Sequence, residues 1–168
     1  MKKSKKTIGI VDISQMSLIK GVLEKETDRI EFLGKYYDEI GEIIVKHEGK
    51  ILKYSSAEIM FVFDNAKKAY ACSEEMVSYY DQNLRKSNEE LFVSLATGDI
   101  YLGEIGHKSL VSYEVLGEPV KTAYAQLKNR DEIDDSIVYC EKTAYELDAG
   151  NLITFTLNKF RKNRDNNK

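Results

Sequence analysis

The sequence predicts an α+β sandwich, with an antiparallel-rich sheet and helices packed on it. Short apolar runs typical of strands alternate with two long segments of helical periodicity. The short runs occur in pairs joined by brief polar turns, as in antiparallel hairpins. The resulting order of strand, helix, hairpin, helix, hairpin places the helices on one side of a sheet. A length of 168 residues, 42% of them hydrophobic, suits one domain with one core.

The first strand is predicted over Thr7–Ile13, an apolar run with Asp12 near its carboxyl end. Polar, turn-prone residues follow at 14–17. From Asp28 to His47, apolar positions recur every three or four residues, which predicts one face of a long helix that Gly49 ends. The expected members of that face are Ile30, Leu33, Tyr37, Ile40, Ile44 and His47.

A hairpin is predicted next, with strands over Lys50–Tyr54 and Glu58–Phe63 and a tight turn between them. A second long helix is expected over Asn65–Leu84, because its alanines and larger apolar residues recur at helical spacing. Both elements lie in the first half of the chain.

The second half begins with a hairpin predicted over Leu91–Ile105. Gly98 and Gly103 interrupt it, and glycine suits a point where the backbone turns or comes close to another segment. Pro119 is well placed in the first turn of a helix that runs to Lys128. Further strands are expected over Val111–Leu116, Ser136–Cys140 and Leu152–Leu157.

The two ends of the chain are basic and its body is acidic. Residues 1–6 and 159–168 hold nine of the 25 basic residues, so they are expected to be solvated tails around a domain at 7–158. That domain keeps 16 basic and 27 acidic residues, a net charge of −11, which argues against a nucleic-acid groove.

No apolar run reaches the roughly 20 residues of a membrane span, and the first residues show no cleavable signal pattern. We therefore expect a cytoplasmic protein with no membrane partner. Cys72 and Cys140 have no second cysteine or histidine near them in sequence, so they are expected to be buried thiols.

Four segments in chain order carry recognisable patterns: VDISQMSL at Val11–Leu18, GKILKYSSAEIMFVF at Gly49–Phe63, LATGDIYLGEIG at Leu95–Gly106 and YEVLGEPVKTA at Tyr113–Ala123. Together they resemble the catalytic domain of class III nucleotidyl cyclases, over about residues 7–157. The resemblance implies a ferredoxin-like sandwich that converts a nucleoside triphosphate into a 3′,5′-cyclic nucleotide and pyrophosphate. It also implies a homodimer, in which one chain supplies the metal ligands of each site and its partner supplies the base and phosphate contacts.

The resemblance further implies two divalent cations, Mg²⁺ or Mn²⁺, held by two aspartates. Asp12 takes the place of the first aspartate, with the Ile13 carbonyl as an additional ligand and the backbone of Ser14 to Ser17 available to the phosphates. Ala57 takes the place of the second aspartate and binds no metal, which fits either an engineered substitution or natural loss. Glu58 is adjacent, but alternation along a strand predicts that it points to the other face, so it would need a bulge to reach the site.

The positions that read the base are better preserved in the resemblance. Lys53 matches a lysine that contacts adenine in adenylyl cyclases, and Glu114 stands where those enzymes carry an aspartate, which favours ATP. Tyr54, beside Lys53, is instead similar to the pyrimidine cyclases of bacterial antiphage systems, which use UTP or CTP. The choice of base therefore stays open.

The positions that stabilise the transition state depart further from the family pattern. Lys121 replaces an asparagine and can still offer a cation to the triphosphate. Ala125 replaces an arginine, which removes a bidentate phosphate donor. His47 and His107 match no site of the family and are expected to be structural or exposed.

These departures leave two interpretations of different class. The first is a nucleotide cyclase that is impaired at its second metal. The second is a catalytically inactive cyclase-like module for nucleotide binding or dimerisation, favoured by the residues at 57, 121 and 125. An unrelated α+β binding domain is a third possibility.

Overall fold

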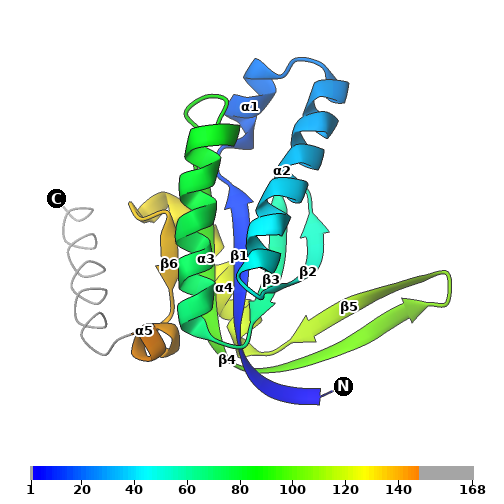
Figure 1. Cartoon of the computed structure of the whole chain (residues 1–168), viewed down its shortest axis with the longest axis vertical. Helices are drawn as coiled ribbons and strands as arrows, with labels where there is room; N and C mark the ends of the chain where they lie inside the picture. The colour runs from blue at the N-terminus through cyan, green and yellow to red at the C-terminus, as the bar shows by residue number, and fades with distance from the viewer. Residues whose placement is uncertain (1, 148–168) are drawn as a thin grey trace.

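The computed structural model describes residues 2–147. Within this range six strands and five α-helices form the α+β sandwich that the sequence predicts (Figure 1). The elements are β1 (Lys2–Ile13), α1 (Met16–Val22), α2 (Glu26–Lys46), β2 (Lys50–Ser55), β3 (Glu58–Phe63), α3 (Ala66–Tyr79), β4 (Leu91–His107), β5 (Leu110–Leu116), α4 (Glu118–Lys128), β6 (Ile137–Tyr139) and α5 (Glu141–Leu147). A π-helical turn (Tyr80–Leu84) continues α3, and a 3₁₀ turn (Arg130–Glu132) follows α4.

The sheet has the strand order β2-β3-β1-β4-β5, and every neighbouring pair in this order is antiparallel. The short strand β6 pairs in parallel with β4. β1 is central, because it pairs with β3 from Thr7↔Phe63 to Val11↔Ile59 and with β4 along its whole length. The strand that ends in Asp12 is therefore held on both sides.

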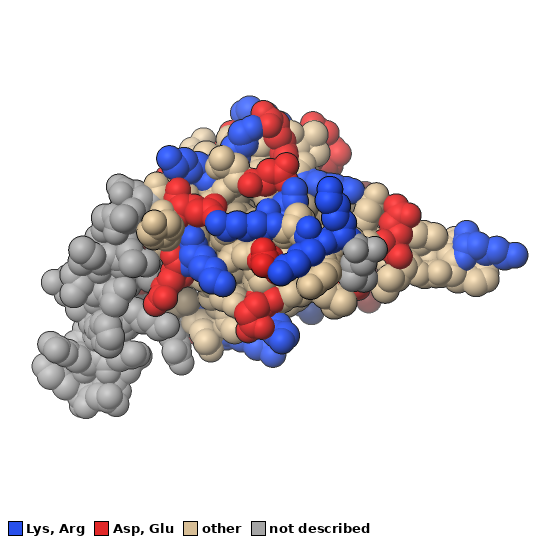
Figure 2. All heavy atoms as spheres, turned by 90° about the horizontal axis from the view of Figure 1, so that it is seen from below, with Lys and Arg blue, Asp and Glu red and all other residues tan. Residues whose placement is uncertain are grey.

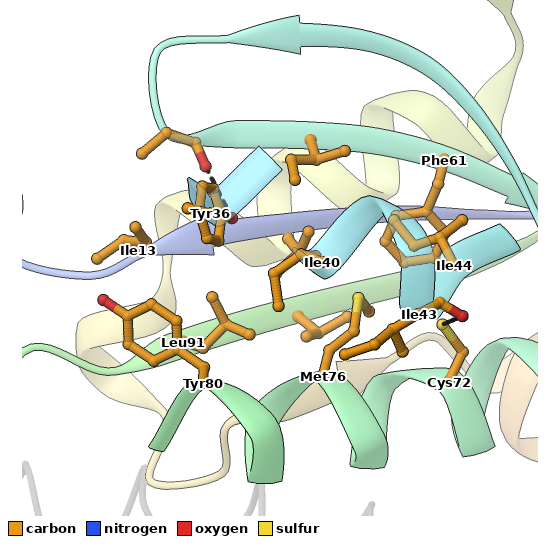
Figure 3. Packing of buried hydrophobic residues seen from close by; sticks show 14 of the residues in the cluster. Ile13, Tyr36, Ile40, Ile43, Ile44, Phe61, Cys72, Met76, Tyr80 and Leu91 are labelled. Atoms are coloured by element: carbon orange, nitrogen blue, oxygen red, sulfur yellow. Dashed lines mark hydrogen bonds between the residues drawn. The ribbon is translucent and has the colours of Figure 1, made fainter. Parts of the chain in front are cut away.

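The expectation of helices on one side of the sheet is wrong, because helices cover both of its faces (Figure 1). α2 and α3 cover one face, and Tyr36, Phe61 and Met76 are almost completely buried there (Figure 3). α4 covers the other face over a smaller cluster that includes Ile10 and Met60. Because side chains alternate along a strand, Val11 and Ile13 of β1 belong to the first cluster and Ile8 and Ile10 belong to the second.

The basic segment at 1–6 is not a free tail where the structure describes it, because residues 2–6 extend β1. Their backbone pairs with residues 98–102 of β4, and three of their lysines pair with acids from β4, α5 and the segment between β3 and α3. Lys3 lies 3.0 Å from Asp99, while Lys5 pairs with Glu146 and Lys6 with Asp64. Figure 2 shows basic and acidic side chains interspersed on this side of the molecule. The second expected tail, 159–168, lies outside the described residues, as does the strand expected over Leu152–Leu157.

The hairpin predicted within Leu91–Ile105 is wrong, since β4 runs without a break from Leu91 to His107. The turn to β5 lies at residues 108–109. Gly98 instead allows a close approach, because a Cβ atom added to it would lie 2.9 Å from the Pro119 side chain. The β5 strand, the α4 helix and the β6 strand lie where the sequence predicts them, within two residues.

The buried face of α2 also differs from the prediction. Ile30 is 71% exposed, and Leu33 and Tyr37 are only partly buried. The observed stripe follows a neighbouring series with the same spacing, in which Phe32 and Tyr36 stack against each other. Its members are Phe32, Tyr36, Ile40, Ile43 and Ile44.

Cys72 is fully buried, and burial raises the pKa of its thiol to about 12. Cys140 is partly buried, and its Sγ lies 3.4 Å from the Thr143 hydroxyl. Neither cysteine forms a disulfide. No helix of the described part of the chain has the length and the apolar character that crossing a membrane requires.

Candidate functional site

Asp12 lies at the end of β1 on the α4 face of the sheet, and it is 8% exposed. The Arg130 guanidinium, from the turn after α4, donates a hydrogen bond from Nη1 to the Asp12 carboxylate. Burial raises the pKa of Asp12, although the hydrogen bond and charge of Arg130 act in the opposite direction. The buried carboxylate thus has a cationic partner within its own chain.

Glu58 is the cross-strand neighbour of Asp12. The last registered pair between the two strands is Val11↔Ile59, so Asp12 and Glu58 are the next residues on each strand and share a face. Burial and the charge of Asp12 raise the pKa of Glu58, whereas Arg130 and Lys53 lower it. Two carboxylates and one guanidinium therefore form one electrostatic cluster.

Ala57 and Glu58 face opposite sides of the sheet, and in this structure Glu58 is the one on the side of Asp12. Ala57 is 2% exposed and belongs to the apolar cluster under α2 and α3, on the face opposite Asp12. Its carbonyl accepts a hydrogen bond of 3.0 Å from the Tyr36 hydroxyl, drawn as a dashed line in Figure 3. The hydroxyl of Tyr37 donates a hydrogen bond to the carbonyl of the preceding residue, Ser56. Helix α2 thus anchors the β2–β3 turn, and Glu58, the first residue of β3, needs no bulge to reach the side of Asp12.

A cavity of about 310 Å³ lies beside this cluster. Ser14, predicted to lie near the phosphates, lines it together with Arg130, so Arg130 stands between the cavity and Asp12. Ser17 lies on α1 and is exposed. The remaining wall is formed by Gln15 and residues 90–92, 131 and 133–136, which include four acidic residues.

The structure brings the two predicted base-reading residues together. The Lys53 ammonium lies 3.5 Å from the Glu114 carboxylate, which joins β2 to β5 although these strands stand at opposite ends of the strand order. Nearby, the Lys50 ammonium lies 3.6 Å from the centre of the Tyr113 ring. Lys53 and Glu114 thus offer a donor and an acceptor side by side.

Three other predicted residues lie apart from this site within one chain. Tyr54 packs against Tyr37 of α2 in a tilted arrangement, with 4.4 Å between the ring centres. Lys121 has a side chain that is 77% exposed, and it pairs with Glu118 one helical turn away. Ala125 is exposed on the same helix. The two histidines are structural or exposed as expected, since His47 bonds to Glu75 and His107 to Ser109.

Residues 2–147 contain no group of three or more His, Cys, Asp or Glu side chains that could hold a metal ion by themselves. The two carboxylates at Asp12 and Glu58 nevertheless suit a hard cation that takes its remaining ligands from water or a bound molecule. Mg²⁺ is typically bound by one or two carboxylates and completes its shell with water and substrate phosphates. The donor set therefore fits a divalent cation that is shared with a polyphosphate.

No protein-family model and no curated protein matches the chain. Its fold matches solved cyclase catalytic domains. The adenylyl cyclase CyaB from P. aeruginosa superposes with a TM-score of 0.71 and 21% identity, over 87% of this chain and 81% of that one. A dimeric guanylyl cyclase domain from the fungus Blastocladiella emersonii gives a TM-score of 0.76 and 15% identity, over 88% of this chain and 85% of that one.

A guanylate cyclase domain from Catenaria anguillulae, solved in complex with GTP, gives a TM-score of 0.75 and 15% identity, over 89% of this chain and 85% of that one. At these identities the comparison establishes the fold. The chain has the α+β fold of adenylyl and guanylyl cyclase catalytic domains.

Proposed function

We propose that the chain is a nucleotide cyclase domain that converts a nucleoside triphosphate into a 3′,5′-cyclic nucleotide and pyrophosphate. The observation that carries this proposal is the pair of carboxylates, Asp12 and Glu58, that face each other across two strands in a cyclase fold. Two adjacent acids in a partly buried position destabilise a fold unless a cation joins them. A pair of like charges that destabilises the fold is typical of a functional site.

Asp12, Glu58 and the Ile13 carbonyl would hold Mg²⁺ or Mn²⁺ in this proposal. When bound, such a cation helps to ionise the attacking 3′-hydroxyl and neutralises charge that develops at the α-phosphate. The backbone of Ser14, at the rim of the cavity, is available to the phosphates. Two metals are expected by the family resemblance, and the two carboxylates found here are the only acidic ligands that we assign.

Lys53 and Glu114 would orient the base by donating and accepting one hydrogen bond each. Their contact, 3.5 Å apart in one chain, supports the base-reading role predicted for both. Tyr54 packs against α2 instead, so its contact with a base requires a change of rotamer. The base is to be identified among adenine, guanine, uracil and cytosine by experiment.

We infer that the active form is a homodimer. The Lys121 side chain is 77% exposed and pairs with Glu118, so it is available to a triphosphate at a partner's site. The β4–β5 hairpin projects from the body (Figure 1) and carries an exposed apolar face. The register places its members on the same side: Tyr101, Ile105, Leu110 and Leu116, which are 43–77% exposed. A second copy of the chain is the occupant that this face suits.

Product analysis tests the proposal. The chain is incubated with Mn²⁺ and each of the four nucleoside triphosphates in turn, and the products are identified by mass spectrometry. We expect a cyclic nucleotide from at least one of them, and loss of that product in Asp12→Asn and in Glu58→Gln. Glu48→Gln, an exposed acid paired with Lys68, is the matched control and should retain activity.

Ala57→Asp decides between the two positions for the second carboxylate. If Glu58 is the ligand, this substitution leaves activity unchanged or lowers it, because the new acid enters an apolar cluster. A rise of about 100-fold, the size typical of a restored electrostatic contact in a transition state, would place the ligand at 57 instead.

An inactive nucleotide-binding or dimerisation module is the second candidate. This alternative is favoured by the burial of Ala57 on the face opposite Asp12 and by the exposure of Lys121 and Ala125. Binding of a triphosphate with Mn²⁺, without any cyclic product from the four substrates or from Ala57→Asp, would establish this alternative.

A further inference from the structure

Arg130 was not identified by the sequence, yet it is the basic side chain that contacts Asp12. It lies at the start of the 3₁₀ turn after α4, 118 residues along the chain from its partner. Its side chain is 28% exposed, and that of Asp12 is 11% exposed. Among the residues that line the cavity beside Asp12, Arg130 is the single basic one. One guanidinium thus borders both the carboxylate pair and the cavity.

Without a bound metal, the charge of the two carboxylates is compensated by the Arg130 guanidinium. Asp12 and Glu58 carry like charges on neighbouring strands, and both are partly or wholly removed from water. Arg130 compensates Asp12 by a charge-assisted hydrogen bond, which is stronger than a neutral one. The guanidinium therefore occupies the position on Asp12 that a divalent cation would take.

Metal binding changes this balance. A divalent cation between Asp12 and Glu58 would repel a guanidinium only a few ångströms away, and the low dielectric of a partly buried site increases that repulsion. The guanidinium can then turn toward the cavity that it already lines. The cavity wall is acidic, with Glu90, Asp131 and Asp135 among its members, so Arg130 is also the group there that can attract a phosphate.

We propose that Arg130 is a phosphate-binding residue of this chain, which Asp12 holds in place until a metal and a polyphosphate displace it. The planar guanidinium suits bidentate contacts to phosphate oxygens. Ala125 and the exposed Lys121 leave α4 without such a donor, and Arg130 follows the end of the same helix. The inference rests on the proposed metal and nucleotide site.

The test separates two binding reactions that Arg130 affects in opposite directions. Mn²⁺ binding alone is measured from the spin-resonance signal of the free ion, and binding of inorganic tripolyphosphate is measured by calorimetry at saturating Mn²⁺. Tripolyphosphate makes the test independent of the base. In Arg130→Gln we expect Mn²⁺ alone to bind several-fold more tightly, because its competitor is gone. We expect tripolyphosphate to bind at least about tenfold more weakly, because a charged donor is lost.

Arg130→Lys keeps the charge and loses the planar fork, so it should recover part of the tripolyphosphate affinity. It also keeps the test decisive if Arg130→Gln fails to fold. Arg85→Gln, which removes an arginine paired with Asp81 on the surface, is the matched control and should change neither affinity.

A fall of both affinities in Arg130→Gln would overturn the proposal, because it would show a role in maintaining the fold. Unchanged affinities would overturn it as well. If the unaltered chain binds Mn²⁺ but no tripolyphosphate, the proposed function fails together with this inference. If the unaltered chain binds both Mn²⁺ and tripolyphosphate, but the Arg130 variants do not show the expected changes in affinity, the proposed function stands and the role of Arg130 fails.

Discussion

The two faces of the sheet differ in what their buried side chains are. The face under α2 and α3 is an apolar cluster that includes the almost completely buried aromatic residues Tyr36, Phe61 and Tyr80 (Figure 3). The face under α4 is apolar only in its middle, and charged residues surround that part. The same strands supply both faces, and alternation along each strand places apolar side chains on one face and the charged side chains of the candidate site on the other.

Strand β3 shows this separation within six residues. Ile59, Phe61 and Phe63 face the α2 and α3 side, whereas Glu58, Met60 and Val62 face α4. A substitution on one side should therefore change stability, and a substitution on the other should change binding. Four predictions test how complete this division is.

The largest effect is expected from Phe61→Ala, on the apolar face. Phe61 is fully buried, and its removal leaves a cavity that should lower the free energy of unfolding by about 3–5 kcal/mol. Urea unfolding measures this loss. Mn²⁺ binding by the protein that remains folded should be unchanged, and a large change in it would show that the two faces are coupled.

Gly9 sharpens this comparison. A Cβ atom on Gly9 would lie 2.1 Å from the Phe61 ring, so Gly9→Ala should also be destabilising in the unaltered chain. In the Phe61→Ala background the same substitution meets no ring and should cost much less. Equal costs in both backgrounds would contradict the packing of Phe61 on Gly9.

A medium effect is expected from Tyr36→Phe. The change removes a buried donor and leaves the Ala57 carbonyl unpaired, which should cost about 1–3 kcal/mol in the free energy of unfolding. Tyr37→Phe is the matched control, because Ser56 is exposed and water can replace the lost donor. Equal losses in the two variants would contradict the assignment of the buried bond.

The smallest effect is expected from Glu58→Gln, which should stabilise the metal-free protein. It removes a like-charge contact across two strands, worth about 0.2–1 kcal/mol. Burial and Asp12 raise the pKa of Glu58, so the folded state binds the proton more tightly than the unfolded chain. The cost of the charge is therefore absent at acidic pH and develops as the pH rises through the raised pKa.

Thermal unfolding of Glu58→Gln and of the unaltered chain from acidic to neutral pH measures this gain. It should be near zero at the acid end and largest near neutrality. A loss of stability at neutral pH would mean that Arg130 and Lys53 stabilise Glu58 more than Asp12 repels it.

Local patterns were sufficient to predict most of the fold. The two short strand-like runs at 50–54 and 58–63, joined by a tight turn, predicted a hairpin, and the apolar run before Asp12 predicted a strand with an acid at its end. The same local reasoning failed at Gly98, because a glycine in a strand has the same sequence signature whether the backbone turns there or lies against Pro119.

The site required information that no local pattern contains. The face on which Glu58 lies depends on the register of β3 against β1, which is set by contacts between distant segments. Arg130 follows the predicted end of a helix without periodicity or motif, and only the tertiary fold brings it to Asp12. Lys53 and Glu114 were predicted from the resemblance, but their contact was not, because it joins the two ends of the strand order.

The uninterrupted course of β4 has a mechanical consequence. Its Phe92 is the registered partner of Asp12, and its far end, His107, closes the projecting hairpin against Leu110. At about 3.4 Å per residue, one strand spans roughly 50 Å between these points. A second molecule that binds the hairpin would therefore contact the same strand that is hydrogen-bonded to the Asp12 end of β1.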